Sequence, residues 1–238
     1  MSESTKSHNI EASLAQVQHS IAESVTAANR LAGSVQLLAV SKKKPLAAIE
    51  AAWAAGQRSF GENYVDEALT KIANWQSLHP DWQAQWHFIG AIQSRKAASI
   101  ATHFDWAHSV DRLKVAQKLS QHRPDTAAPL SVCIQVNLDN EPSKSGVATQ
   151  EVAELASQIA SLPNLKLRGL MSIPAPRSSV DDQRAVFREL ADVQQSLKSE
   201  HPAIDTLSMG MSADMDAAIL EGSTIVRVGT AIFGERNG

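Results

Sequence analysis

Apolar positions along this chain follow two alternating patterns. Between Ile10 and Leu31 they recur at spacings of three and four, which is the periodicity of an amphipathic helix. The run Val35–Ser41 is almost continuously apolar and has the length of a buried strand. A helix is expected from Pro45 to Gly56, because proline is favoured in a first helical turn and glycine is a natural helix stop. The chain therefore begins as helix, strand, helix.

The strand-then-helix unit recurs along the rest of the chain. Further strand-like runs begin at Ser59, Gln85, Trp106, Leu130, Leu165 and Thr206, and the last spans Thr224–Gly234. Helical patterns between them cover Ala68–Trp75, Ser94–His103, Asp111–His122, Thr149–Leu162, Asp181–Glu200 and Asp214–Glu221. The predicted strands are mostly apolar without regular polar alternation, which is typical of a parallel sheet that is covered on both faces.

We therefore predict an α/β fold, a single (β/α)8 TIM barrel over residues 35–238 with an extra N-terminal helix in residues 1–34, together forming one domain. An open doubly wound sheet would show the same alternation. The count of eight predicted strands favours the barrel. So does the turn Ser41–Pro45 after the first strand, which lacks the G-x-G-x-x-G of a dinucleotide-binding loop.

Composition narrows the class of protein without indicating a function. The chain has 238 residues, 43% of them hydrophobic, and a formal net charge of −3, which is too balanced for a nucleic-acid-binding surface. Its one cysteine, Cys133, cannot form an intrachain disulfide or a zinc cluster, so we expect a cytoplasmic location and no metal. We expect no membrane association, because no apolar stretch approaches the ~20 residues of a bilayer span and the N-terminus lacks a signal-peptide core.

Candidate chemistry follows from the predicted barrel, because functional residues of this fold lie where strands end. Lys42 follows the first strand and shares a face with Leu38 and Val40, so it is an inward amine if that face lines the barrel. Such a lysine can form a Schiff base with a carbonyl compound. Lys43 falls on the opposite face, whereas parity does not separate Lys42 from Lys44. A solvated basic turn is the alternative interpretation.

The loops after the seventh and eighth strands have the composition of a phosphate site. Ser208–Ser212 brings two hydroxyls around a glycine, and Arg227–Thr230 brings a glycine and a threonine beside an arginine. Small residues let backbone N–H groups approach phosphate oxygens, and barrels frequently hold a phosphate in these two loops. Two tight turns are the alternative. A Schiff-base lysine opposite a phosphate loop describes a site for pyridoxal 5′-phosphate (PLP).

Long motifs between about Leu37 and Arg236 resemble the YggS/PROSC family of PLP homeostasis proteins. The motifs that carry the resemblance are AVSKKKP, FGENYVDEA, WHFIGAIQSRK, KSGV, RGLMSIPAP and LSMGMSADMDAAILEGSTIVRVGTAIFG. The resemblance implies a fold like the N-terminal barrel of alanine racemase. The positions that match the family's cofactor-binding residues are Lys42 for the Schiff base, Ser212, Gly229 and Thr230 for the phosphate, Ser208 and Met209 in the same loop, Arg227 for the pyridine nitrogen, and Asn63 and Met171 beside the ring.

The same resemblance implies a binding protein without established catalytic turnover. A permanently charged Arg227 disfavours protonation of the pyridine nitrogen, which weakens PLP as an electron sink. A racemase also needs acid–base groups on both faces of the substrate carbon. Related racemases take a tyrosine from a second domain, whereas this chain has one tyrosine, Tyr64, and ends four residues after Gly234. The family implies a monomer that maintains PLP (vitamin B6) and amino-acid pools, with PLP-dependent apo-enzymes as recipients.

Two other functions remain as alternatives. A PLP-dependent amino-acid racemase would use Lys42 and His87 as its bases, although His87 also fits a hydrogen-bonded residue of the barrel interior. A protein-interaction module would not need Lys42.

Several further polar residues have two interpretations. Lys144 is either a phosphate ligand or a loop lysine, and Glu62 either pairs with a lysine of the basic turn or lies at the surface. Asp214 and Asp216 are expected to meet the dipole of the helix that follows.

Overall fold

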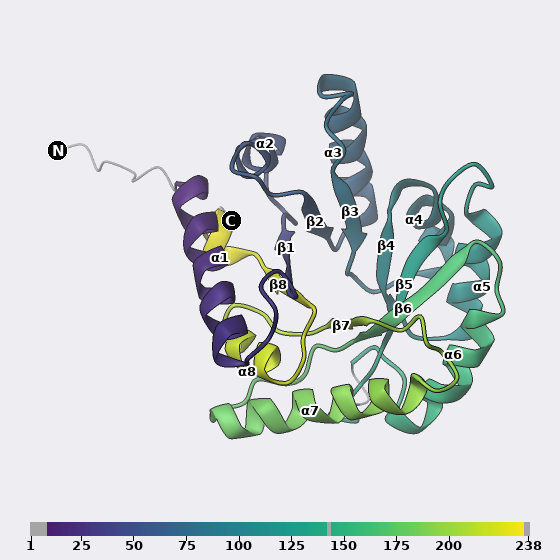
Figure 1. The fold of residues 1–238 in the computed structure, drawn as a ribbon. Helices are drawn as coiled ribbons and strands as arrows, with labels where there is room; N and C mark the ends of the chain where they lie inside the picture. The colour runs from purple at the N-terminus through teal and green to yellow at the C-terminus, as the bar shows by residue number, and fades with distance from the viewer. Residues whose placement is uncertain (1–8, 142–143, 236–238) are drawn as a thin grey trace.

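The computed structural model describes residues 9–141 and 144–235, and its strands form a closed parallel barrel in chain order (Figure 1). The strands are β1 Gln36–Val40, β2 Ser59–Glu62, β3 Gln85–Phe88, β4 Trp106–Val110, β5 Leu130–Gln135, β6 Leu165–Met171, β7 Thr206–Ser208 and β8 Ile225–Val228. Pairing of β1 with β8, in which Leu38 lies opposite Arg227, closes the sheet. The predicted (β/α)8 barrel is confirmed, and the open doubly wound sheet is excluded.

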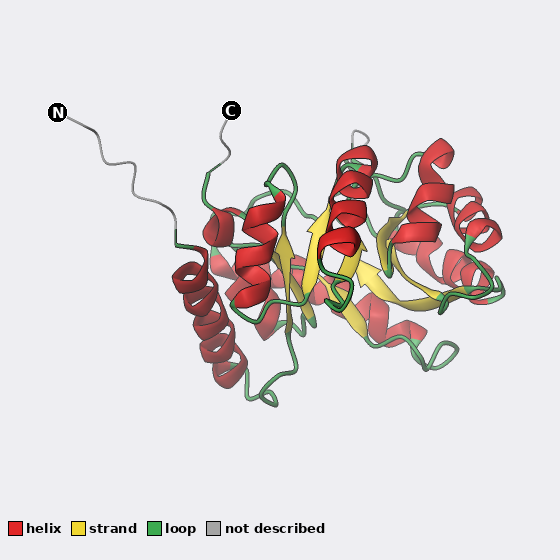
Figure 2. Ribbon diagram, turned by 90° about the horizontal axis from the view of Figure 1, so that it is seen from above, coloured by secondary structure: helices red, strands yellow, loops and turns green. Residues whose placement is uncertain are grey.

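Helices lie around the strands when the barrel is seen from above (Figure 2). They are α1 Ile10–Ala27, α2 Leu46–Ala54, α3 Val65–Leu78, α4 Ala97–His103, α5 Leu113–His122, α6 Val152–Ala160, α7 Val180–Leu197, α8 Met215–Leu220 and α9 Thr230–Phe233, with 3-10 turns η1 Ser94–Lys96 and η2 Thr149–Glu151. Within residues 9–141 and 144–235, no helix is both long and apolar enough to cross a membrane.

The extra helix α1 packs against α2, α8 and α9, beside the first and last strands (Figure 1). It buries Leu14, Val17, Ile21 and Val25, as the helical spacing predicts. The division of the chain at residue 34 stays a prediction, and residues 1–8 and 236–238 of the two predicted segments lie outside the described residues.

Helix α1 ends four residues earlier than its apolar pattern predicts. Asn29 adopts a left-handed conformation with φ 52°. The N–H of Arg30 then donates to the carbonyl of Val25, and the N–H of Asn29 donates to that of Thr26, both at 3.0 Å. These two bonds form a Schellman motif, which terminates a helix. Leu31, the predicted last residue, is 84% exposed.

The run predicted as a last strand from Thr224 to Gly234 contains two elements. Strand β8 ends at Val228, and α9 begins at Thr230 after a turn at Gly229. The apolar residues Ile232 and Phe233 are buried in the main core by this turn. A straight continuation of the strand would carry them beyond the end of the barrel, so their burial favours the helix.

Alternate residues of each strand face either the helices or the barrel interior. Outward residues such as Leu37 and Ala39 join the helices in one hydrophobic core. Inward residues form two small apolar clusters, one of Leu38, Ile89 and Ile225 with Val40 against them, and one of Trp106, Cys133 and Met171. The polar side chains that hydrogen-bond to one another in the interior are Gln36, Ser59, Gln85, His87, His108, Ser208 and Arg227. Barrel interiors are usually filled by branched apolar residues, so this polar content needs a reason beyond packing.

Candidate functional site

Lys42 lies in the turn immediately after β1. Leu38 and Val40 face inward, and Ser41 turns outward because its hydroxyl donates to Oε1 of Glu62 at 2.7 Å. Lys42, which is half-buried, lies in the turn that follows.

The two lysines that follow Lys42 have other environments. Lys43 is exposed, with φ 59°, and its ammonium lies 5.8 Å from the centre of the Tyr64 ring. Lys44 donates from Nζ to the carbonyl oxygens of Gly234 at 3.0 Å and Glu235 at 2.7 Å. The alternation of side chains could not distinguish Lys44 from Lys42. In the structure, Lys44 is hydrogen-bonded to the segment after α9.

A buried ion cluster holds the residues on both sides of Lys42. Nζ of Lys71 donates to the carbonyl of Ser41 at 2.8 Å and to Oε1 of Glu62 and Glu67, at 2.9 and 2.5 Å. The N–H of Lys43 donates to the same oxygen of Glu67 at 2.6 Å. Burial raises the pKa of Glu62 despite the nearby Lys71. Glu62 thus pairs with a lysine, but with one on α3 and not with one of the basic turn. Lys71 was not predicted from the sequence, although its spacing from Glu67 is that of an i,i+4 pair.

Arg227 is buried inside the barrel, with a fixed guanidinium group. Its Nη1 donates to the carbonyl and hydroxyl oxygens of Ser208 at 2.5 and 2.8 Å, and its Nη2 donates to the carbonyl of Ser172 at 2.9 Å. Burial lowers the pKa of Arg227 to about 10, so the group stays charged at neutral pH. At most two of its five N–H groups then remain for a ligand.

The loop after β7 lies beside strand β8. The N–H of Arg227 donates to the carbonyl of Gly210 at 3.0 Å. Gly210 has φ 92°, and a Cβ there would lie 2.6 Å from that of Ala218, so this turn requires glycine. A Cβ on Gly229 would lie 3.2 Å from the carbonyl oxygen of Val40, which brings this loop close to β1.

The predicted phosphate residues differ in exposure. Ser212 and Thr230 are exposed, and Gly229 is half-buried. Met209 is fully buried in the core between sheet and helices, so only its main chain can contact a ligand at the mouth. Asp214 is the N-cap residue of α8, but its carboxylate accepts from the N–H of Met211 at 2.6 Å and makes no capping bond to the helix. Asp216 lies in the first turn of α8, as predicted.

The buried polar atoms that have no hydrogen-bond partner among the described residues include Oδ1 of Asn63 and the hydroxyl of Ser172, both near the mouth. Asn63 follows β2, and Ser172 follows β6 beside Arg227. Buried polar atoms are normally paired, so these two are candidates for contact with a ligand. Sequence reasoning had singled out Asn63 through the family resemblance, but it assigned no role to Ser172.

Asn63, Asn137, Lys144 and Ile173 line a cavity of about 270 Å³ at this end of the barrel. Nζ of Lys144 lies 2.9 Å from a carboxylate oxygen of Glu141 and 3.3 Å from one of Asp139. The hydrogen bond to Glu141 is the main reason that its pKa is raised. Lys144 thus lines the cavity at the mouth, where it forms ion pairs with Asp139 and Glu141.

The remaining interior candidates are fully buried. His87 is hydrogen-bonded to Gln85 and His108, which confirms its interpretation as a residue of the barrel interior. Cys133 and Met171 pack together with Trp106, and burial raises the pKa of the Cys133 thiol to about 12, so the thiol is unreactive. His108 was missed, although its spacing from Trp106 on the same strand places both on one face.

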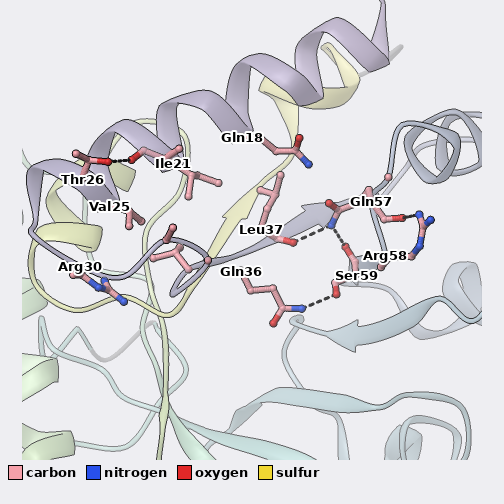
Figure 3. Close-up of a pocket in the computed structure, with 15 residues that line it drawn as sticks. Gln18, Ile21, Val25, Thr26, Arg30, Gln36, Leu37, Gln57, Arg58 and Ser59 are labelled. Atoms are coloured by element: carbon pink, nitrogen blue, oxygen red, sulfur yellow. Dashed lines mark hydrogen bonds between the residues drawn. The ribbon is translucent and has the colours of Figure 1, made fainter.

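A second cavity, of about 570 Å³, lies at the opposite end of the barrel, between α1 and the beginnings of β1 and β2 (Figure 3). Its lining includes Ile21, Val25, Arg30, Gln36 and Ser59. None of the described residues that line it is a lysine, and it lies away from the strand ends that carry function in this fold.

The chain is similar to known proteins over most of its length. The family model "Alanine racemase, N-terminal domain" matches residues 13–237. The pyridoxal phosphate homeostasis protein of Vibrio alginolyticus is 57% identical over 204 residues, which cover 86% of this chain and 88% of that protein. The protein of the same name from Escherichia coli K12 is 50% identical over 230 residues, covering 97% and 98%.

Solved structures extend the comparison. PipY of Synechococcus elongatus, with PLP bound, matches with a TM-score of 0.78 and 38% identity, covering 90% of this chain and 100% of PipY. An alanine racemase of Clostridium difficile matches with a TM-score of 0.72 and 11% identity, covering 93% of this chain and 57% of the racemase. The second likeness shows the shared fold alone.

Proposed function

Because this chain belongs to the family of pyridoxal phosphate homeostasis proteins, which share the barrel of the alanine racemase N-terminal domain, we propose that it binds PLP and helps to maintain PLP and amino-acid pools. PLP is held as a Schiff base on Lys42. When bound, PLP supplies an aldehyde that condenses with an amine.

One observation carries the assignment to Lys42. This lysine follows β1, whose residues Leu38 and Val40 face inward, and β1 pairs with β8, where Arg227 lies opposite Leu38. The candidate amine and the candidate ring partner therefore belong to neighbouring strands of one barrel mouth. Lys44 is engaged at the segment after α9, and Lys43 is turned toward Tyr64 in solvent.

The other residues fit the remaining parts of PLP. Arg227 faces the pyridine nitrogen, oriented by its bonds to Ser208. The residues that hold the phosphate are Ser212, Gly229 and Thr230, with the main chain of Met209. Asn63 and Met171 flank the ring, and the unpaired Oδ1 of Asn63 supports a ligand contact there.

The geometry supports a carrier more than the alternative function, a PLP-dependent amino-acid racemase. Arg227 is a fixed cation, which disfavours a protonated ring nitrogen and so weakens the electron sink. Burial lowers the pKa of His87 to about 3, and both of its ring nitrogens are hydrogen-bonded inside the barrel. His87 therefore cannot take a proton from a substrate at neutral pH, and the proposed second base of a racemase is lost.

Trapping of bound PLP tests the proposal. We expect a visible absorption band on mixing the protein with PLP, and borohydride should fix a phosphopyridoxyl group on Lys42, identified by peptide mass analysis. Lys42→Ala should lose the adduct, while Lys43→Ala and Lys44→Ala keep it. An adduct spread over the three lysines, or none, would refute the assignment. Turnover of an amino-acid enantiomer that requires Lys42 would favour the racemase.

Family membership also supports three finer proposals. The protein acts as a monomer, in the cytoplasm, and it delivers PLP to PLP-dependent apo-enzymes. Sedimentation velocity at micromolar concentration tests the first, because a dimer would contradict it. Failure of the loaded protein to activate any apo-enzyme faster than free PLP would contradict the delivery.

A further inference from the structure

A chain of hydrogen bonds crosses the barrel interior and ends at Arg227. Oε1 of Gln85 lies 2.9 Å from Nε2 of His87, and Nδ1 of His87 lies 2.9 Å from Nε2 of His108. Nδ1 of His108 lies 2.8 Å from the hydroxyl of Ser208, which accepts from Nη1 of Arg227 at 2.8 Å. Four strands, β3, β4, β7 and β8, contribute to the chain.

Oε1 of Gln85, at the end remote from Arg227, determines which group donates in each of these hydrogen bonds. Oε1 of Gln85 is a carbonyl oxygen, which also accepts from Nε2 of Gln36 at 3.3 Å and from the hydroxyl of Ser59 at 3.2 Å. Gln36 in turn donates to Ser59 at 2.6 Å, where both line the second cavity (Figure 3). Nε2 of His87 must therefore carry a proton and donate it to Gln85.

Burial keeps a single proton on each imidazole. His87 and His108 are both 0% exposed. Burial lowers the pKa of His87 to about 3, and burial together with His87 and Arg227 lowers the pKa of His108 well below its ordinary value. A neutral His87 accepts at Nδ1, so His108 donates from Nε2 and accepts at Nδ1. The hydroxyl of Ser208 must then donate to His108, and its oxygen accepts from Arg227.

We propose that His108, supported by His87, is a positioning residue that acts through Ser208 to hold the guanidinium of Arg227 toward the pyridine nitrogen of PLP, an inference that rests on the function proposed above. The three oxygens that accept from Arg227, two of Ser208 and one of Ser172, are neutral. The arginine is therefore fixed in direction without a carboxylate in contact with it, and its charge remains effective toward the ring. The hydroxyl of Ser208 is committed to His108 and cannot donate to the ring.

The protein without PLP provides the first test. Long-range ¹H–¹⁵N NMR of histidine-labelled protein distinguishes charged imidazole from its two neutral forms. We expect His87 and His108 to be neutral with the proton on Nε2 throughout pH 6 to 9. A proton on Nδ1 of either ring, or a charged ring, would overturn the direction of the chain and with it the proposal. This result does not depend on PLP binding.

Variants at the middle of the chain provide the second test. His108→Leu removes the acceptor for Ser208, whereas His108→Asn keeps an oxygen near the position of Nδ1. We expect His108→Leu to shift the absorption maximum of bound PLP in the same direction as Arg227→Gln, and to raise the Kd for PLP about tenfold, the effect of one hydrogen bond. His108→Asn should restore most of both values. His103→Leu, on the exposed end of α4, is the matched control and should change neither.

The outcomes separate the inference from the proposed function. If Arg227→Gln shifts the spectrum and a folded His108→Leu does not, the positioning role is wrong and PLP binding stands. If His108→Leu does not fold, Ser208→Ala breaks the same link with the loss of one hydroxyl, and an unshifted spectrum there is equally negative. If wild-type protein forms no adduct on Lys42, the proposed function fails, and the role of the histidines toward PLP fails with it.

Discussion

At the mouth of the barrel, the position of Asn63 depends on the residue that packs against its backbone. A Cβ added to Gly90 would lie 2.2 Å from the carbonyl oxygen of Asn63, which is far inside contact distance. The backbones of these two residues, which follow β2 and β3, can approach only because Gly90 has no side chain. The candidate ring contact Asn63 is thus placed by a neighbour that has no side chain.

Gly90→Ala should therefore disturb the mouth. The backbone of Asn63 must move, so we expect a loss of about 1–3 kcal/mol in the free energy of unfolding and weaker PLP binding. Urea unfolding and PLP titration measure the two effects. Gly61→Ala is the comparison, because its Cβ would meet side-chain carbons of Ile89 and Leu38 at 3.2 and 3.3 Å, and side chains can move. Unchanged PLP affinity in Gly90→Ala would argue against Asn63 as a ring contact.

At the scale of elements, the turn after β1 is held by α3. Lys71 and Glu67 on α3 and Glu62 on β2 bond to the backbone or hydroxyl of Ser41 and to the N–H of Lys43. The turn is therefore anchored immediately before and after Lys42. Such anchoring reduces the conformational entropy that the turn would lose on binding a ligand.

Lys71→Met should destabilise the protein, because it breaks this cluster of ion pairs. The variant leaves Glu62, whose side chain is 0% exposed, without its cation, and we expect a loss of about 3–5 kcal/mol in the free energy of unfolding. The double variant Lys71→Met with Glu62→Gln should recover part of the loss, because the buried carboxylate is gone. Urea unfolding measures both. A loss below about 1 kcal/mol for Lys71→Met would mean that the cluster does not stabilise the turn.

At the scale of the whole molecule, the barrel encloses ionisable groups whose charge at neutral pH depends on how far burial lowers each pKa. His87 and His108 are neutral inside the barrel, although an unfolded histidine has a pKa near 6.5. Arg227 keeps its charge. The fold therefore becomes sensitive to pH at two residues that are remote from solvent.

Stability should fall as the solution becomes acidic. The folded pKa of His87 is lowered to about 3, so the unfolded chain binds more protons below about pH 6.5, and the stability present above that pH is lost progressively toward pH 3. Between pH 7.5 and 5.0, His87 alone should lower the free energy of unfolding by about 2 kcal/mol, and His108 acts in the same direction.

Urea unfolding at several pH values measures this loss. His87→Gln should lower the pH dependence by about one proton, while the exposed His103→Gln should leave it unchanged. Equal slopes in wild type and His87→Gln would show that His87 is not neutral in the folded protein.

Local patterns in the sequence are sufficient for the architecture. Apolar runs and helical spacings predict the elements of the barrel because these patterns reflect burial on one or two faces of a single element. The end of α1 was misjudged because the left-handed Asn29 and its two capping bonds leave no signal in hydrophobic spacing. The family motifs identified the candidate cofactor residues, and the roles of Lys42, Ser212, Gly229 and Thr230 remain predictions.

The sequence by itself determined the order of elements and the barrel, since the pattern of each element depends on residues close together in the chain. Only the tertiary structure decided which polar groups meet inside the barrel. Ser208 reaches His108 across 100 positions of sequence, and Lys71 reaches Ser41 across 30. Such pairs have no local signature, because they exist only when closure of the barrel brings distant strands and helices within hydrogen-bonding distance.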